Sequence, residues 1–473
     1  MPTDEQPLGS TVAEGDALLD EELSPVELVP IPGKTARVKA RPVEPSERVG
    51  PVDVLRGVAL LGILAMNIVD FAWPRGVYDI PVLDPGAGPL DSALWAFNHL
   101  VFDTKMMTLF SMLFGAGLVL MYDRAIGRGA RLGWIFYRRV FWLLVIGLIH
   151  AYLLWEGDIL VMYASCGFLL YPFRKLRPRT LIITGVAFNL LLVPFFLGFR
   201  FGAVSYMWRT YERVEAEVKA EKQPTWWDGL VHAGWKRMSH EELPKREDFL
   251  KEIEWYRGPY RALVKQRVGS LIGNQTIGFL LGGWWFAGGR MLIGMGLMKL
   301  GVFAAQRTRR FYVVVMLAGY GIGLPLMAFD AYHEIAHNFF LGHHFWYALD
   351  GWPFLTFYGS LPVVLGHIGA LMLICQTGAI PWLTRRLGAV GRMALSNYLF
   401  HSILFTTLFY GYGFDLFGTI HRPLLFLLVL AVWTFQLLAS PLWLEVFRYG
   451  PAEWVWRSLT YWKLQPLWAR PLS

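Results

Sequence analysis

The sequence predicts an all-α protein, a polytopic transmembrane helical bundle of about ten spans, and three observations support this. Of the 473 residues, 55% are hydrophobic and 17% are charged, whereas about 25% of residues are charged in an average soluble domain. Ten apolar segments are long enough to cross a bilayer as helices. Basic residues lie in short clusters between these segments, a pattern of membrane topology and not of nucleic-acid binding. The apolar content and the two cysteines exclude a disordered chain and a disulfide-rich secreted domain.

The expected spans are continuous apolar runs, helical because lipid cannot satisfy exposed backbone groups. They cover residues 54–73, 93–121, 136–155, 157–173, 180–200, 270–303, 311–330, 354–376, 391–411 and 423–442. A tight hairpin at 155–158 separates the third span from the fourth. The run at 270–303 is long and glycine-rich and carries Arg290, so it forms either one tilted helix or two shorter pieces.

The domain organisation follows from where the chain is polar or amphipathic. We expect a disordered cytoplasmic tail at 1–50, five-span bundles at 51–200 and 269–442, an extracytoplasmic amphipathic insertion at 201–268 and a cytoplasmic interfacial tail at 443–473. No signal peptide precedes the first span, which therefore serves as an uncleaved anchor. The insertion places Trp226, Trp227 and Trp235 at the level of the headgroups, either as a substrate cap or as a passive spacer.

Lys and Arg indicate the orientation because they accumulate on cytoplasmic loops. Basic clusters lie between the second and third spans, between the fourth and fifth, at 307–310 and at 385–392, whereas the alternate short connections are nearly bare. Both termini are therefore expected in the cytoplasm. Ten spans alternate consistently with this orientation, which favours a single crossing at 270–303.

Candidate catalytic residues lie near the outer ends of the spans, where ionisable groups usually mark a pathway or a reaction centre. His150 precedes Glu156 and Asp158 across the hairpin. An imidazole beside a carboxylate is the arrangement that a general base needs. The alternative is a histidine hydrogen-bonded for packing. Asn67 on the first span and His99 on the second complete the candidate set.

Candidate cofactor-binding residues lie at the inner ends. Asp53 and Arg56 stand three apart at the start of the first helix, close enough to pair. One interpretation is a structural cap and topology anchor. The other makes Arg56, with Arg138 and Arg139, a clamp for a cytoplasmic phosphate-bearing cofactor, because guanidinium groups match phosphate geometry.

No metal site is predicted, although one motif has the spacing of metal ligands. His333 and His337 have the H-E-x-x-H spacing of a zinc site, and His343 and His344 follow. The motif begins at the end of a span and not within a zinc-binding helix fold. We therefore expect no zinc chemistry there, and substrate contact or no chemistry instead.

Six segments of the chain resemble the YeiB-like family of bacterial membrane proteins, which is known as a domain of unknown function. They are DVLRGVALLGILAMNI (53–68), LFSMLFGAG (109–117), HAYLLWEGDILVMYA (150–164), GRMLIGMGLMKLG (289–301), GRMALSNYL (391–399) and FRYGPAEWVWRSLTY (447–461). They occur in the order of the family. The resemblance implies a multi-pass protein of the bacterial cytoplasmic (inner) membrane, in contact with lipids.

The first spans of that family are similar to transmembrane acetyltransferases such as heparan-alpha-glucosaminide N-acetyltransferase. This likeness implies acetyl-CoA or another acyl-CoA as cytoplasmic donor and a glycan or other extracytoplasmic acceptor. Asp53, Arg56 and Gly57 would open the shared helix, and Asn67 would close it and hydrogen-bond the oxyanion. Those relatives carry a catalytic histidine between the first two spans, but this chain has none from 68 to 94. His99 or His150 would take that role.

Three functions agree with the sequence. The first is an integral-membrane acyltransferase with an extracytoplasmic acceptor. The second is a transporter or permease for a small solute or lipid, which would need a midplane site that opens to both faces. The third is an inert scaffold, and a homodimer is compatible with each of them. Arg56 and the neighbouring basic loops favour the transferase.

Overall fold

The computed structural model describes residues 49–130, 132–238, 246–336, 339 and 353–469, within one compact unit formed by Lys39–Ser473. This part of the chain is helical, and its one extended pairing is an isolated bridge between Phe447 and Trp468. The all-α fold class is therefore confirmed. Six helical stretches of the described residues are long and apolar enough to cross a membrane, so the count of about ten spans is not confirmed. Apart from residues 49 and 50, the predicted N-terminal tail lies outside the described residues.

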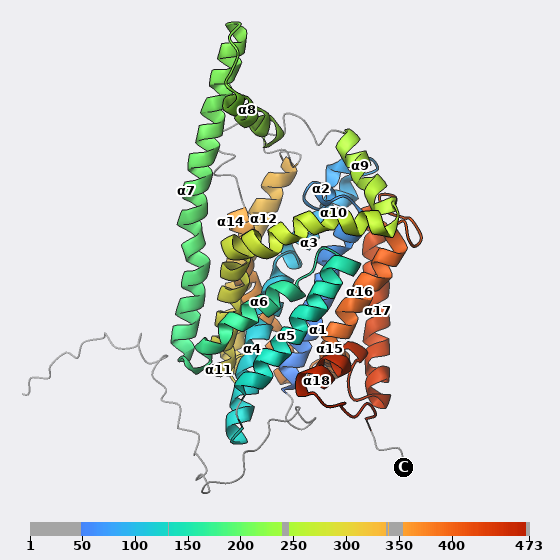
Figure 1. Ribbon diagram of the computed structural model, residues 1–473. Helices are drawn as coiled ribbons and strands as arrows, with labels where there is room; N and C mark the ends of the chain where they lie inside the picture. The colour runs from blue at the N-terminus through green and yellow to red at the C-terminus, as the bar shows by residue number, and fades with distance from the viewer. Residues whose placement is uncertain (1–48, 131, 239–245, 337–338, 340–352, 470–473) are drawn as a thin grey trace, which may run out of the picture. The chain divides into compact units, whose positions relative to one another are not determined.

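The N-terminal half places α1 inside the bundle and α7 along one side of it (Figure 1). Its elements are α1 (Gly50–Ala72), α2 (Arg75–Asp79), η2 (Pro81–Leu83), α3 (Pro89–Val101), α4 (Lys105–Gly127), α5 (Gly133–Ile149), η3 (His150–Leu154), α6 (Leu160–Leu170), η4 (Tyr171–Lys175) and α7 (Pro178–Lys219). Pro51 in the first turn and Asp53 beside it favour the start of α1. Helix α1 is largely apolar, and most of it is buried because α4, α15, α16 and α17 pack against it.

The predicted hairpin joins α5 to α6. At His150, α5 changes into the single π-helical turn η3, and the backbone becomes extended at Trp155. Such turns widen a helix locally and often occur at functional sites. Here the π turn ends the helix directly before the polar residues of the hairpin.

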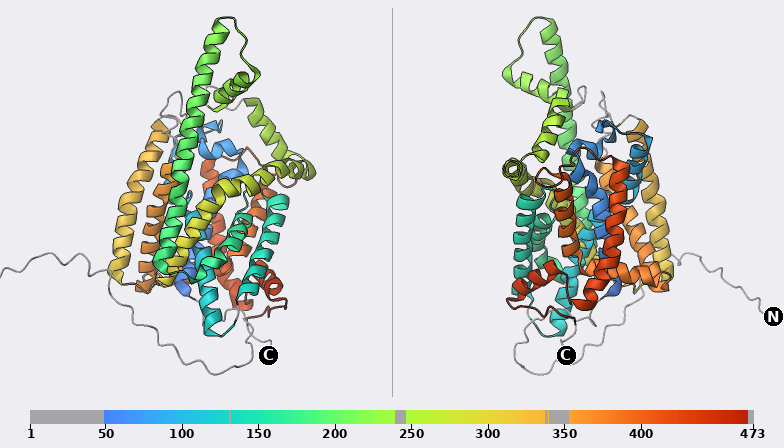
Figure 2. Two further views of the ribbon diagram at one scale, coloured as in Figure 1. Left: turned by 60° about the vertical axis from the view of Figure 1, so that its left-hand side comes forward. Right: turned by 90° about the vertical axis from the view of Figure 1, so that its right-hand side faces the viewer.

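The predicted insertion contains three further helices, α8 (Trp226–Met238), α9 (Arg246–Arg257) and α10 (Tyr260–Gly273). The expected boundary at residue 200 lies inside α7, which continues to Lys219 and projects past the neighbouring helices (Figure 2). Trp226 and Trp227 are largely exposed, but Trp235 is buried against Trp208 and other aromatic or apolar residues of α7. Helices α9 and α10 cover the hairpin, as their hydrogen bonds to residues 153–156 show.

The run at 270–303 is one helical path. Helix α10 passes into the π-helical η5 (Asn274–Gly288) and then into α11 (Gly289–Lys299), and both junctions keep right-handed helical backbone angles. This run is not among the six described stretches that are long and apolar enough to cross a membrane, so the single crossing stays a prediction. The remaining helices are α12 (Arg309–Ala336), α14 (Pro353–Thr377), α15 (Pro381–Arg392), α16 (Ala394–Phe409), α17 (Arg422–Val446) and α18 (Pro451–Tyr461).

Glycines allow two pairs of helices to touch backbone to backbone. A Cβ on Gly115 of α4 would lie 2.0 Å from the carbonyl oxygen of Met291, and one on Gly294 of α11 would lie 2.0 Å from that of Met112. A Cβ on Gly57 would likewise lie 2.1 Å from the carbonyl oxygen of Leu387 in α15. Small residues of this kind let membrane helices approach closely.

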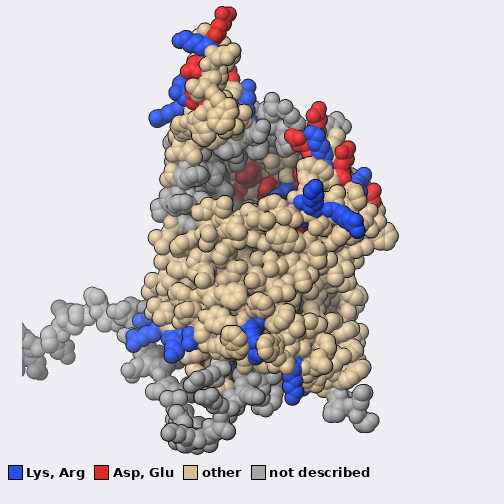
Figure 3. Space-filling view, in the orientation of Figure 1, with Lys and Arg blue, Asp and Glu red and all other residues tan. Residues whose placement is uncertain are grey.

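The bundle has two chemically different ends. We call the end where α1 and α5 begin the basic end, and the end that holds residues 155–158 the hairpin end. Figure 3 shows Lys and Arg side chains along the lower part of one face, and Asp and Glu side chains inside a hollow near the top, below α8 and beside α9. The top of the same face also carries Lys and Arg beside Asp and Glu, at the tip of α7 and on α9, so only the lower part shows one sign of charge (Figure 3).

Candidate functional site

A cavity of about 250 Å³ lies inside the basic end. Helices α1, α4, α5, α6, α15, α16 and α18 line it, so segments that are far apart in the sequence form one wall. Five arginines contribute to its lining, namely Arg56, Arg124, Arg139, Arg392 and Arg457. Asp53 and Glu453 are the acidic residues among the same lining residues. The cavity therefore carries a strong positive charge, which favours an anionic ligand.

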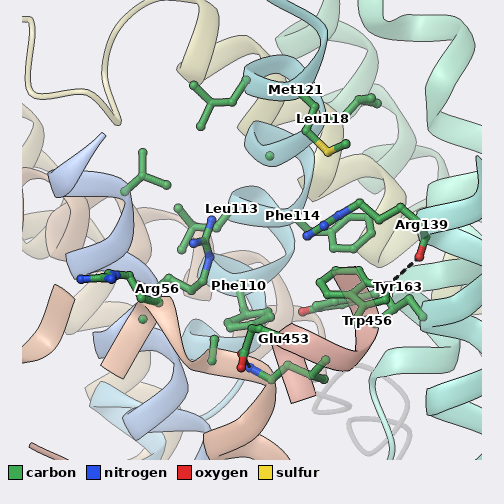
Figure 4. A pocket seen from close by; sticks show the side chains of 18 of the residues that line it. Arg56, Phe110, Leu113, Phe114, Leu118, Met121, Arg139, Tyr163, Glu453 and Trp456 are labelled. Carbon is green, nitrogen blue, oxygen red and sulfur yellow. Dashed lines mark hydrogen bonds between the residues drawn. The ribbon is translucent and has the colours of Figure 1, made fainter. Parts of the chain in front are cut away.

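Arg56 and Arg139 lie on opposite sides of the cavity, and neighbouring residues hold each of them in place (Figure 4). Arg56 donates a hydrogen bond to Asp53 at 2.8 Å, as the spacing of the two residues predicts. The Arg139 guanidinium lies over the ring of Trp456, 3.6 Å from its centroid, and the Trp456 indole N–H donates to the Arg139 carbonyl oxygen. Of the predicted basic pair, Arg139 lines the cavity, whereas Arg138 lies over Trp462, 5.0 Å from the ring centroid.

Glu453 connects α18 to the start of α16. Its carboxylate accepts the backbone N–H of Leu395 at 2.6 Å, the N–H of Ser396 at 3.2 Å and the Ser396 hydroxyl at 2.5 Å. Burial raises the pKa of Glu453 above its ordinary value. An acceptor at this position satisfies N–H groups that a helix start leaves unpaired. Glu453 thereby fixes the start of α16, the helix that carries Tyr398 and Ser402.

The cavity becomes apolar and aromatic away from its arginines. Phe110, Phe114 and Tyr163 lie between Arg56 and Arg139 in Figure 4. Deeper lining residues include Ile63, Leu143, Ile159, Leu160 and Tyr398. A ligand with a phosphate-rich head and a slender, less polar arm matches this gradient.

Tyr398 is also the neighbour of His150. The two ring centroids are 5.0 Å apart. The Tyr398 hydroxyl lies 3.4 Å from both the Gly157 carbonyl oxygen and the Ile159 backbone nitrogen. This tyrosine therefore connects the wall of the cavity to the predicted catalytic hairpin.

His150 forms a buried chain with two partners. Its Nδ1 lies 2.7 Å from Asp158 Oδ1, and its Nε2 lies 2.7 Å from the Ser402 hydroxyl oxygen. An ionised carboxylate only accepts, which assigns the proton to Nδ1 and leaves Nε2 to accept from Ser402. His150 is 1% exposed and Ser402 is fully buried. This order of acid, imidazole and hydroxyl has the geometry of a catalytic triad, which is recognised by geometry and not by sequence position.

Glu156, the other predicted carboxylate, takes a different partner. It accepts a hydrogen bond from the Tyr256 hydroxyl of α9. Burial raises the pKa of Tyr256 well above its ordinary value, so this hydroxyl keeps its proton and donates. Asp158, and not Glu156, is therefore the carboxylate that orients His150.

His99 belongs to a separate cluster near α12. Its Nε2 lies 2.7 Å from Asp330 Oδ2, and its Nδ1 lies 3.6 Å from Asp103. The Lys105 ammonium donates to the His99 carbonyl oxygen at 2.5 Å, and Trp95 stacks on the imidazole. Carboxylates thus face both ring nitrogens, an arrangement that holds the ring in place.

Asn67 is not a hydrogen-bond partner of either histidine in the described part of the chain. It lies half-buried on α1, and no hydrogen bond between described residues joins it to His150 or His99. The structure thus brings Asp158 to His150 and assembles Asp53, Arg56 and Arg139 around the cavity.

The described residues contain no group of three or more side chains that could hold a metal ion. His333 lies on α12, whereas His337, His343 and His344 of the H-E-x-x-H region lie outside the described residues.

Ser402, Tyr398 and Glu453 were not predicted from the sequence. Tyr398 and Ser402 are four residues apart on one helix, a spacing that places both on the same face. That spacing was a usable signal, since a hydroxyl and a phenol on one face of an apolar span need partners. Glu453 gave no such signal because its partners, two backbone N–H groups and the Ser396 hydroxyl, are 57 and 58 residues away.

Comparisons with known proteins give a family and no activity. A family model described as "Protein of unknown function (DUF418)" matches residues 297–463. The "Uncharacterized protein YxaH" of Bacillus subtilis (strain 168) is 33% identical over 440 residues, which cover 90% of this chain and 98% of the relative. The "Uncharacterized protein YeiB" of Escherichia coli (strain K12) is 32% identical over 426 residues, which cover 88% and 96%. An "Uncharacterized 39.9 kDa protein in amylase 3'region" of Bacillus acidopullulyticus is 26% identical over 429 residues. No solved structure matches the chain.

Proposed function

The chain belongs to the YeiB-like (DUF418) family, and we propose that it is an integral-membrane acyltransferase that uses cytoplasmic acyl-CoA and an extracytoplasmic acceptor such as a glycan. The observation that carries the proposal is the chain Asp158–His150–Ser402, which lies beside a tyrosine of the arginine-lined cavity. Donor binding and acyl transfer then occur at adjacent places in the bundle, with the basic end in the cytoplasm of the inner membrane.

The cavity would hold the donor. CoA carries several phosphate oxygens, for which Arg56, Arg139 and the other lining arginines supply bidentate donors. Its pantetheine arm would extend along the apolar wall toward Tyr398. Aromatic lining residues exclude water, which strengthens the ion pairs and protects the thioester.

His150 would activate Ser402 for the first half of the reaction. As the Ser402 oxygen attacks the thioester carbonyl, its proton passes to His150 Nε2, and Asp158 stabilises the imidazolium. The C–S bond breaks, a C–O bond to Ser402 forms, and the CoA thiolate takes the proton from His150. The products are acyl-Ser402 and free CoA.

The second half returns the enzyme to its starting state. An acceptor hydroxyl or amine loses its proton to His150 and attacks the ester carbonyl. The bond between the acyl carbon and Ser402 breaks, and the serine oxygen regains the proton from His150. The net reaction moves one acyl group from sulfur to the acceptor and needs no further reactant.

The test is to titrate the purified protein with acetyl-CoA by calorimetry and then to examine the protein by mass spectrometry. We expect binding that Arg56→Ala and Arg139→Gln weaken, roughly tenfold or more per lost charged contact. Ser402→Ala and His150→Ala should keep donor binding but lose the covalent acyl group. Absence of CoA binding in the wild-type protein would refute the proposal and favour a transporter.

A further inference from the structure

A second cluster of unused hydrogen-bond donors lies at the hairpin end. Arg267 of α10 is 2% exposed, and one guanidinium nitrogen donates to the Leu154 carbonyl oxygen at 3.1 Å. Its Nε and second terminal nitrogen have no acceptor among the described residues. The hydroxyl of Tyr410, a fully buried residue, has no partner there either.

The two residues face one another. The Arg267 guanidinium carbon lies 5.2 Å from the centroid of the Tyr410 ring and 5.9 Å from that of Tyr256. These cation–π contacts leave two of the guanidinium nitrogens without a hydrogen-bond acceptor among the described residues. Glu156 on the hairpin is already bonded to Tyr256, and no ion pair between described residues joins it to Arg267.

Unused donors in such a place require an explanation. Nearly all buried polar groups are hydrogen-bonded, and each exception costs free energy. Arg267 and Tyr410 offer donors, one of them cationic, and a planar guanidinium fork matches a carboxylate or a phosphate. We infer that Arg267 and Tyr410 form a binding site for an oxyanion.

The location of the site relates it to the acceptor. Tyr410 follows the end of α16 eight residues after Ser402, which corresponds to about 12 Å along a helix. Leu154, which binds Arg267, belongs to the π turn that begins at His150. The inference rests on the proposed function in one respect, namely that the oxyanion is a carboxylate or phosphate group of the acceptor. An acceptor that reaches both places is an extended molecule, such as an acidic oligosaccharide.

The experiment measures binding of three probes to the purified full-length protein by calorimetry: glucuronate, glucose 1-phosphate and uncharged glucose. We expect the two anions to bind and glucose to bind at least tenfold more weakly. Comparing glucuronate with glucose 1-phosphate distinguishes a carboxylated acceptor from a phosphorylated one. Failure of both anions to bind, or equal binding of glucose, overturns the inference.

Matched variants assign the binding to this cluster. Arg267→Gln should weaken anion binding roughly tenfold or more, and Tyr410→Phe severalfold. Tyr410→Phe is the sharper test because its hydroxyl has no partner to lose, so thermal stability should not fall. Arg261→Gln, at an exposed position of α10, is the charge-matched control and should keep full affinity.

Unchanged affinity in Arg267→Gln overturns the inference. Acetyl-CoA binding, measured in parallel, separates failure here from failure of the donor site.

Discussion

The ring of Tyr398 lies 5.0 Å from the ring of His150, and the same tyrosine lines the arginine-rich cavity. One side chain therefore lies both at the wall of the cavity and beside the imidazole that accepts from Ser402. Tyr398 and Ser402 are also one helical turn apart on α16, so a movement of this turn would affect both.

Tyr398→Ala should remove the ring beside His150 and let water enter from the cavity. We expect acyl transfer to an acceptor to fall by roughly 10²-fold, since small misplacements of reacting groups have effects of this size, while acyl-CoA hydrolysis rises. Release of free thiol, compared with transfer of a radiolabelled acyl group, measures the two reactions. Tyr398→Phe keeps the ring and is the control. A Tyr398→Ala protein with unchanged transfer would show that the ring does not keep water from the site of acyl transfer.

The assignment of the base can be tested with two acidic residues. Asp158→Asn should lower transfer by about 10³- to 10⁴-fold, as expected when an imidazole loses the carboxylate that fixes its tautomer. Donor binding should persist because Asp158 contacts His150 and not the arginines. Asp103→Asn, beside His99, should have a much smaller effect. The reverse order of effects would make His99 the base.

Glu453 should make thermal stability depend on pH. Its folded-state pKa is raised by burial, so its contribution to stability is fully present below the pKa of an unfolded glutamate and is lost as the pH rises through the raised value. We expect Glu453→Gln to remove this part of the pH dependence. The measurement is Tm against pH, with Glu445→Gln, at an exposed position, as control. Parallel profiles for wild type and Glu453→Gln would contradict the prediction.

Gly115→Ala should destabilise the protein by about 1–3 kcal/mol, the usual cost of adding a carbon where there is no room. Its Cβ would lie 2.0 Å from the backbone oxygen of Met291, which cannot move without separating α4 from α11. Gly117, two residues further on α4, has no heavy atom within 4 Å of its ideal Cβ position. Gly117→Ala is therefore the matched control in thermal unfolding, and equal effects of the two variants would contradict the packing argument.

The sequence was most informative where a signal is local. Continuous apolar runs predicted the helices, and the spacing of three residues predicted the ion pair of Asp53 and Arg56. The contact of His150 with Asp158 was also predictable, because eight residues and one hairpin separate them. Ser402 is 252 residues from His150, and Arg267 is 113 residues from Leu154. No period or motif in one sequence specifies such pairs, since they depend on which helices become neighbours.

The 42 residues of α7 have a further practical consequence, since a helix of that length extends about 63 Å, roughly twice the thickness of a hydrocarbon core. Its last turns are braced by α8, through Arg213 with Asp228 at 2.6 Å and His232 with Glu215 at 2.9 Å. A short epitope inserted at 220–225 would therefore stand clear of the lipid without disturbing the rest of the bundle. Antibody labelling of intact spheroplasts would then report directly which compartment the hairpin end faces.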